Sequence, residues 1–366
     1  MHSTEFSEWK RFYDNNELSG FNDSASGLLW LKLKTLARKE LFDNFIQANS
    51  LTVSASTLAG KWEQSFDFLQ QNLSHSHLII DKFIRQIQKN QLEQFDEQSL
   101  LSELYKLKNY DWGGDYKNNL DKHLVDTFIK VYRSHDELTA KLENEILRSV
   151  TGYVFCSWYN HWSSILIENL FKSHPLVLPA IGQIKKVDFF IGPVPFDLKV
   201  TYLPSNFIEV KRKQYGMKPE LTQLRQAARK IGVSFQKHRN SIDTYYEISE
   251  KLKDRNDEAS RETLANIDET RNTILAEARK NPKELIVNLY EKQGEMRFDA
   301  ANRLFLILVD SSNYDESWKL RRNLDLLKPT INNYLDNFSD QSNLKTQFNY
   351  AGKEYQCLAD CIFVVR

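Results

Sequence analysis

Two short runs of alternating side chains, joined by a turn, constrain the fold of this chain more than any other stretch. Residues 186–191 and 196–202 are rich in β-branched and aromatic residues, and Gly192-Pro193-Val194-Pro195 lies between them. Runs of this kind bounded by glycine and proline predict an antiparallel hairpin.

The predicted hairpin gathers charged side chains on one surface. A turn centred between Gly192 and Pro193 sets Asp188 directly opposite Asp197, with Cβ atoms roughly 5 Å apart. Because side chains alternate along a strand, Asp197 shares its face with Lys199 and Thr201, whereas the apolar residues between them point into a core. Opposed like charges destabilise a sheet, so a bound divalent cation is a natural reason for the pair. Mg²⁺ prefers such oxygen ligands, and the pattern predicts a magnesium site.

The remainder of the chain is predicted to be rich in helix. Gly is 12 and Pro is 8 among 366 residues, which favours long helices and argues against an all-β fold. Residues 1–150 show helical periodicity and are predicted to form a mainly helical region for target recognition or dimerisation. A glycine pair within residues 110–116 predicts a loop.

The sequence pattern changes from helical periodicity to a mixture of helical and β-like runs after residue 150, and residues 151–366 are predicted to form an α/β core. A helix over residues 157–172 precedes the hairpin, and another begins at Pro219. A charge-dense helical insertion is expected at about 241–297. A buried strand follows at 304–309, then helix over 318–338 and a β-like run at 361–365.

The hairpin motif resembles that of the PD-(D/E)XK nuclease superfamily, which includes many restriction endonucleases. Asp188 matches the first acidic residue of the family, and Asp197-Leu198-Lys199 matches the Asp-x-Lys element. Glu168, in the preceding helix, matches the glutamate that often joins the metal site. Gln223 and Arg225, in the following helix, match positions where the family often adds polar supporting residues, and Thr201 extends the Asp-x-Lys run.

The resemblance implies a restriction-endonuclease-like core, which is a mixed sheet flanked by helices. It also implies that Asp188 and Asp197 ligate Mg²⁺, with Mn²⁺ able to substitute, that Lys199 positions and activates water, and that Glu168 supports the metal. Two departures are visible, because Val187 stands where the family usually has proline and the spacing between the two aspartates is short. The resemblance covers about 150–235 and 304–309, and does not extend to the first 150 residues.

A rival acidic-x-Lys motif lies in the same window. Glu209-Val210-Lys211 also sits on an alternating apolar run, at an acceptable distance from Asp188. Asp197 is preferred because only it pairs across the hairpin with Asp188, and because Pro204-Ser205-Asn206 breaks the chain before Glu209.

A local basic stripe follows the hairpin although the whole chain has a formal net charge of zero. Residues 211–239 hold nine Lys and Arg against one acid, Glu220. Such a stripe beside a nuclease motif favours contact with phosphates, and an ordinary solvated helix face is the alternative. The predicted nucleic-acid contacts are Lys211, Arg212, Lys213, Arg225, Arg229 and Lys230.

Together these features predict a Mg²⁺-dependent endodeoxyribonuclease, most simply a type II restriction endonuclease that cuts a specific double-stranded site. Cutting a palindrome implies a two-fold homodimer and a cognate methyltransferase acting on the same site. Two alternatives stay open: a non-specific or triggered antiviral effector nuclease, and a catalytically silent nucleic-acid-binding protein. Three cysteines exclude a disulfide scaffold, and the absence of a long apolar run or secretory signal predicts a cytoplasmic protein without a membrane span.

Overall fold

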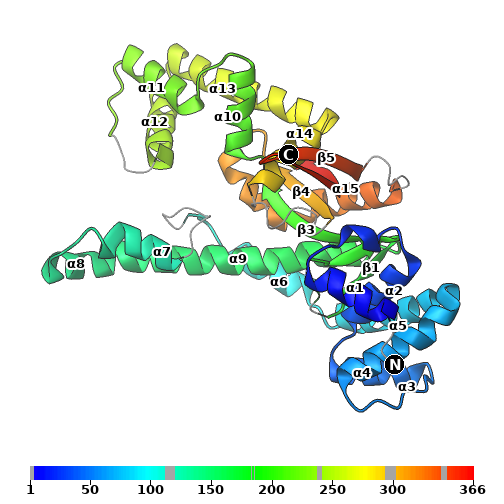
Figure 1. The fold of residues 1–366 in the computed structure, drawn as a ribbon. Helices are drawn as coiled ribbons and strands as arrows, with labels where there is room; N and C mark the ends of the chain where they lie inside the picture. The colour runs from blue at the N-terminus through cyan, green and yellow to red at the C-terminus, as the bar shows by residue number, and fades with distance from the viewer. Residues whose placement is uncertain are drawn as a thin grey trace.

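The chain folds around a six-stranded mixed sheet flanked by helices, with a helical bundle at one end and two helical arms at the other (Figure 1). The computed structural model describes residues 4–111, 120–182, 184, 186–236, 241–292, 302–338 and 344–366. Most of the predicted loop at 110–116, Lys237 and Arg239 of the basic stripe, and the end of the predicted insertion lie outside these ranges.

The described part of residues 1–150 is helical, as the sequence predicts. α2 is apolar on every side and forms the centre of a bundle, where Trp30 is fully buried against Trp62. Leu178, Val187 and Phe190 belong to the same core, so the bundle packs on the β1–β2 edge of the sheet. The elements are α1 (Thr4–Asp14), η1 (Ser19–Phe21), α2 (Ala25–Thr35), α3 (Lys39–Ala48), α4 (Leu58–Leu69), η2 (Gln70–Asn72), α5 (Leu73–Glu93), α6 (Glu97–Leu104), α7 (Leu120–Leu124), η3 (Val125–Ile129), α8 (His135–Lys141) and η4 (Leu142–Ile146).

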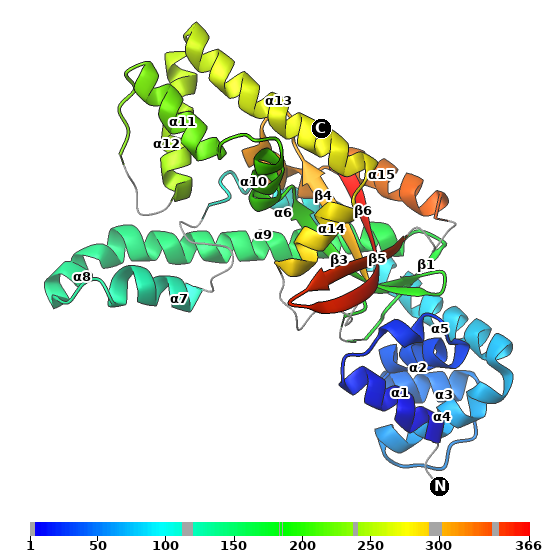
Figure 2. The same cartoon turned by 45° about the horizontal axis from the view of Figure 1, so that its top comes forward.

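Helix α9 (Leu147–Lys172) crosses the expected boundary at residue 150 and joins the two halves of the chain. Its carboxyl-terminal part packs Ile167 and Phe171 into the sheet core. Its amino-terminal part extends away from the sheet as an arm beside α7 and α8 (Figures 1 and 2). No described helix is long and apolar enough to cross a membrane.

The predicted hairpin and its register are confirmed. Phe189 pairs with Phe196 and Ile191 with Val194, and Gly192 turns the chain at a φ of +57°, a conformation that favours glycine. The order in the sheet is β1-β2-β3-β4-β6-β5, with β3, β4 and β6 parallel and the other neighbours antiparallel. The strands are β1 (Val177–Pro179), β2 (Phe189–Ile191), β3 (Val194–Tyr202), β4 (Arg303–Val309), β5 (Lys345–Tyr350) and β6 (Lys353–Val365).

Each face of the sheet is covered by helices (Figure 2). Leu198 and Leu304 point to the face that carries α9 and α15 (Leu324–Asp336). Phe305 and Ile307 point to the opposite face, where α10 (Ser205–Gln214), α13 (Glu258–Lys280) and α14 (Lys283–Glu291) pack. Because β4 is covered on both faces, its sequence is a continuous apolar run.

The region between β3 and β4 corrects one expectation. Residues 207–211, which read as an alternating apolar run, belong to helix α10. The helix expected from Pro219 is α11 (Glu220–Lys230). α12 (Ser241–Arg255) packs with α11 and α13 around Leu224, Ile248 and Ile267. This second arm therefore has a small core of its own.

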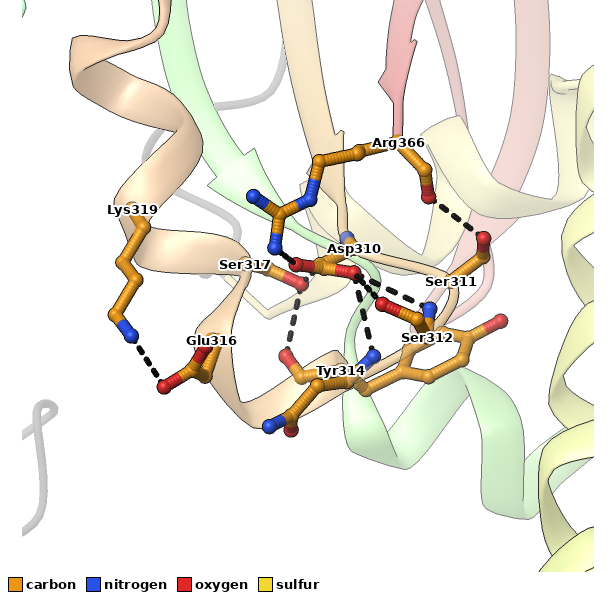
Figure 3. Close-up of polar contacts among 9 residues, drawn as sticks. Asp310, Ser311, Ser312, Tyr314, Glu316, Ser317, Lys319 and Arg366 are labelled. Carbon is orange, nitrogen blue, oxygen red and sulfur yellow. Dashed lines mark hydrogen bonds and ion pairs between the residues drawn. The ribbon is translucent and has the colours of Figure 1, made fainter.

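The segment after β4 is fixed by the carboxylate of Asp310. Its Oδ1 accepts hydrogen bonds from the backbone and hydroxyl of Ser312, and its Oδ2 pairs with Arg366 at the end of β6 (Figure 3). The amide of Asp310 in turn donates to Ser317 Oγ. These contacts set the direction of η6 (Tyr314–Arg322), which returns beneath α9.

Arg321 of η6 joins α9 to β3. Its guanidinium is buried and donates to the carbonyl of Val200 at 2.9 Å, to the hydroxyl of Tyr202 at 3.1 Å, and to the hydroxyls of Ser163 and Ser164 at 3.2 Å each. A planar donor with several fixed partners holds the helix and the strand in one relative position.

We expect Arg321→Met to lower the free energy of unfolding by about 3 kcal/mol, because it leaves several buried acceptors without donors. Urea denaturation measures this loss. Arg11→Met, at an exposed position on α1, is the control and should change the free energy by less than about 0.5 kcal/mol. Equal effects of the two substitutions would contradict the role given to Arg321.

Candidate active site

Three of the residues predicted from the hairpin motif lie together, and a fourth, Glu168, is within electrostatic reach of one of them. Asp188 immediately precedes β2, Asp197 and Lys199 lie on β3, and Glu168 lies on α9. Lys199 Nζ donates to Asp197 Oδ1 at 2.6 Å. Besides burial, the charges of Asp197 and Glu168 both raise the pKa of Asp188, so each of these two carboxylates is within electrostatic reach of Asp188.

Asp188 occupies the point where the chain joins the sheet. Its backbone N–H donates to the carbonyl of Phe196, and its Oδ2 accepts from the backbone N–H of Leu198 at 2.7 Å. The Asp188 carboxylate thus accepts a backbone hydrogen bond from β3, as a backbone carbonyl would if β2 were longer. Burial raises the pKa of Asp188 to about 6, with Asp197 and Glu168 adding to the rise, while the Leu198 hydrogen bond and the Lys199 ammonium oppose it.

Asp197 is the most enclosed member of the group, at 6% exposure, and lies between two cations. Lys199 holds one oxygen, and Arg303 Nε lies 3.6 Å from the other. Arg303 begins β4 and is paired with Asp197 in the parallel register, so the sheet itself sets this contact. Its guanidinium lies 4.7 Å from the centre of the Tyr290 ring and is 1% exposed.

The other predicted members are placed less tightly. Glu168 is half-buried and accepts a hydrogen bond from Lys172 at 2.9 Å on the next turn of α9. Thr201 shares the face of Lys199 by strand alternation and is paired with Ile307 of β4. Lys199 remains 36% exposed, so its ammonium can be reached from solvent.

The carboxylate oxygens of the hairpin suit a hard cation that takes only some of its ligands from the protein and the rest from water. Mg²⁺ is commonly held by one or two carboxylates and keeps several waters, and Asp188 and Asp197 provide two carboxylates in contact with solvent through Asp188. A cation would also relieve the repulsion that raises the pKa of Asp188. Within the described ranges, no group of three or more His, Cys, Asp and Glu side chains is close enough to hold a metal on its own.

The two supporting residues on α11 are directed elsewhere. Gln223 accepts a hydrogen bond from Arg212 at 2.5 Å and donates to Asn266 at 3.0 Å, so its amide links α10, α11 and α13. Arg225 lies half-exposed on the same helix. The structure therefore gives Gln223 a packing role in the second arm.

The rival motif has different surroundings from those expected. Glu209 accepts the backbone N–H of Glu220 at 3.0 Å and so caps the start of α11. Lys211 Nζ lies 2.7 Å from Glu284 and 3.6 Å from Glu277. Both residues lie on helix α10, where Glu209 contacts α11 and Lys211 contacts α13 and α14, so they do not form the second strand of a hairpin.

The basic stripe is narrower on the surface than in the sequence. Lys211 and Arg212 are buried, and Arg212 donates to the carbonyl of Lys218. Lys213 lies exposed on α10. Arg229 and Lys230 are exposed in the last turn of α11. Lys213, Arg229 and Lys230, together with the half-exposed Arg225, are therefore the cations of the stripe that a phosphate can reach.

Arg303 is the site residue that the sequence reasoning missed. It stands directly before the apolar run that predicts β4, and a lone basic residue at the start of a strand is usually solvated. Only the parallel pairing of β3 with β4, which a sequence does not state, brings it to Asp197.

Comparison of the chain with protein-family models, with curated proteins and with solved structures finds no match.

We expect Asp188→Asn to stabilise the metal-free protein at pH 8 and to stabilise it much less at pH 4.5. A folded-state pKa raised to about 6 means that Asp188 favours folding below its unfolded pKa and loses that contribution as the pH rises through 6. Asparagine keeps the acceptor for Leu198 and removes the charge. The Tm should rise by roughly 1–3 °C at pH 8.

Thermal melts in EDTA at both pH values measure this effect. Asp14→Asn, at an exposed position on α1, is the control and should show no difference between the two pH values. A Tm change for Asp188→Asn that is the same at pH 4.5 and pH 8 would contradict the electrostatic account of the cluster.

Proposed function

We propose that this protein is a Mg²⁺-dependent endonuclease that hydrolyses phosphodiester bonds of DNA. One observation carries the proposal: Asp188, Asp197 and Lys199 lie together on the hairpin, and Glu168 of α9 is within electrostatic reach of Asp188. The mixed sheet flanked by helices agrees with the kind of core that the PD-(D/E)XK resemblance implies.

In this proposal Asp188 and Asp197 hold the metal, and Glu168 supports it from α9. The bound ion supplies a Lewis acid and a water of lowered pKa. Lys199 is held by Asp197, so its ammonium has a defined position beside the two carboxylates. From there it orients the attacking water and stabilises the negative charge that develops on the phosphoryl oxygens. Arg303 keeps Asp197 oriented from the buried side.

The particular activity that best fits is that of a type II restriction endonuclease on double-stranded DNA, acting in the cytoplasm with a cognate methyltransferase. Lys213, Arg229 and Lys230 are exposed on α10 and α11, where they provide a phosphate-binding surface in the second arm. A homodimer would give the protein the two-fold symmetry of a palindromic site.

We expect wild-type protein with Mg²⁺ to cut unmethylated plasmid or phage DNA into discrete fragments, and Asp197→Ala to reduce the rate by at least 10³-fold. The substitution removes a proposed metal ligand and the partner of Lys199. Gel electrophoresis measures cleavage, with EDTA and the exposed-site variant Asp14→Ala as controls.

The pattern on the gel separates the alternatives. A smear that is lost with EDTA and with Asp197→Ala would indicate a non-specific nuclease. Intact DNA in every lane would contradict an autonomous DNA nuclease, and would favour a triggered effector or a catalytically silent nucleic-acid-binding protein. Cleavage by Asp197→Ala at the wild-type rate would refute the assignment of the site.

We expect the double substitution Arg229→Ala and Lys230→Ala to weaken DNA binding and to reduce the slope of log affinity against log salt by about 2, since each lost phosphate contact contributes roughly one unit. Binding to a labelled duplex in Ca²⁺ or EDTA, titrated with KCl, measures the slope. Lys10→Ala with Arg11→Ala on α1 is the control. An unchanged slope would remove α11 from the DNA interface.

A further inference from the structure

A large pocket lies apart from the carboxylate cluster, along the amino-terminal half of α9. Its volume is about 1090 Å³, and it is bounded by α9, the segment after α6, the start of η6 and one residue of α12. Trp158, on its wall, precedes Glu168 by ten residues on the same helix. At 1.5 Å per residue this places the pocket about 15 Å from the proposed catalytic glutamate.

The floor of the pocket is a rigid aromatic surface. The rings of Tyr110 and Trp318 stack with centroids 5.3 Å apart at an interplanar angle of 16°. Trp318 also meets the edge of Tyr159 and the guanidinium of Arg322, and the Tyr110 hydroxyl donates to Asn160 at 2.7 Å. Because these contacts fix both rings, the surface is formed before any ligand arrives.

Two more aromatic side chains line the pocket with much of their surface open. Phe155 of α9 is 53% exposed and Tyr246 of α12 is 44% exposed. Aromatic rings that are held at a pocket with open faces suit a flat ligand, which buries ring surface without disturbing the fold.

The polar lining has both acceptors and cations. Five carboxylates line the pocket, those of Glu103, Asp111, Glu143, Asp315 and Glu316, together with three cations, Lys106, Lys108 and Arg148. Glu103 is paired with Lys106. Glu316 is paired with Lys319 and so is partly neutralised (Figure 3). Carboxylates accept N–H groups such as those on the edges of adenine, cytosine and guanine, and lysine and arginine bind phosphates.

We propose that this pocket binds a nucleobase, either a base displaced from its stack in a nucleic-acid strand or the base of a free nucleotide. The aromatic walls provide stacking, the carboxylates accept from the base edge, and Lys108 and Arg148 meet the attached phosphate. The volume suits a ligand of nucleotide size.

The inference goes beyond the proposed cleavage and is tested without it. Wild-type protein in EDTA is titrated with each of the four deoxynucleoside monophosphates by calorimetry, and with a labelled 12-nucleotide single strand of mixed sequence by fluorescence anisotropy. Phe155→Ser should weaken binding about tenfold or more, since stacking on one aromatic ring contributes about 1–3 kcal/mol per base. Phe68→Ser is the matched control, because Phe68 is 51% exposed on α4, far from this pocket in sequence.

Weakened binding in Phe155→Ser with unchanged binding in Phe68→Ser supports the pocket. If the monophosphates bind in this way, the ligand is a free nucleotide; if only the single strand does, it is a base within a strand. Binding that is insensitive to Phe155→Ser, binding of none of these probes, or binding only of an octa-arginine peptide overturns the proposal. Asp197→Ala should bind as wild type does, so a failure of cleavage and a failure of this pocket are distinguishable.

Discussion

The register of the β2–β3 hairpin is the constraint on which the candidate site depends. A turn at Gly192 pairs Ile191 with Val194 and Phe189 with Phe196, and Asp188 lies directly before β2, where it forms hydrogen bonds with Phe196 and Leu198 on either side of Asp197. One residue of slippage would send one of the two carboxylates to the opposite face. The parallel pairing of β3 with β4 then adds Arg303 beside Asp197. Two pairings of backbone strands thus determine which charges meet.

The arrangement of charges around Asp188 is not one that stability alone would favour. Asp188 is held in a partly buried position where Asp197 and Glu168 oppose its ionisation, and its pKa rises to about 6. Lys199 and Arg303 both contact Asp197, and the charge of Lys199 offsets only part of the rise in the pKa of Asp188. A fold under no functional constraint would not gain from such a cluster, and strongly shifted carboxyl groups of this kind are common at catalytic and metal sites.

The helices around the sheet explain how the cluster is presented. α9 carries Glu168 at one end and the aromatic pocket at the other, and Arg321 fastens it to β3. α13 packs on the face of the sheet opposite α9, and the arm that it forms with α11 and α12 has its own core and reaches the α9 pocket through Tyr246 (Figures 1 and 2). The pocket, the hairpin carboxylates and the exposed cations of α11 therefore all lie on helices and strands that pack against one another.

Much of this arrangement was predictable because it is local in the sequence. Alternation and turn residues predict β3 and its partner, and the apolar run at 304–309 predicts β4. The rival motif was harder, because the same alternation at residues 207–211 fits a helix whose polar residues cap α11 and pair with α13 and α14. The burial of Lys211 was not predictable, since it depends on Glu277 and Glu284, tens of residues away in the chain, and that of Arg212 depends on the return of the chain to Lys218 and Gln223. The same holds for Arg303, whose contact with Asp197 needs the order of strands.

The most direct test of the central claim is Mn²⁺ binding, measured by electron paramagnetic resonance on wild-type protein and on Asp188→Asn and Asp197→Asn. Mn²⁺ takes the oxygen ligands that Mg²⁺ takes and reports its own binding. The account predicts a Mn²⁺ site in the wild type, in the presence of DNA, that is weakened at least tenfold in both variants and displaced by Mg²⁺. Equal Mn²⁺ binding by all three proteins would show that the hairpin carboxylates are not the metal site.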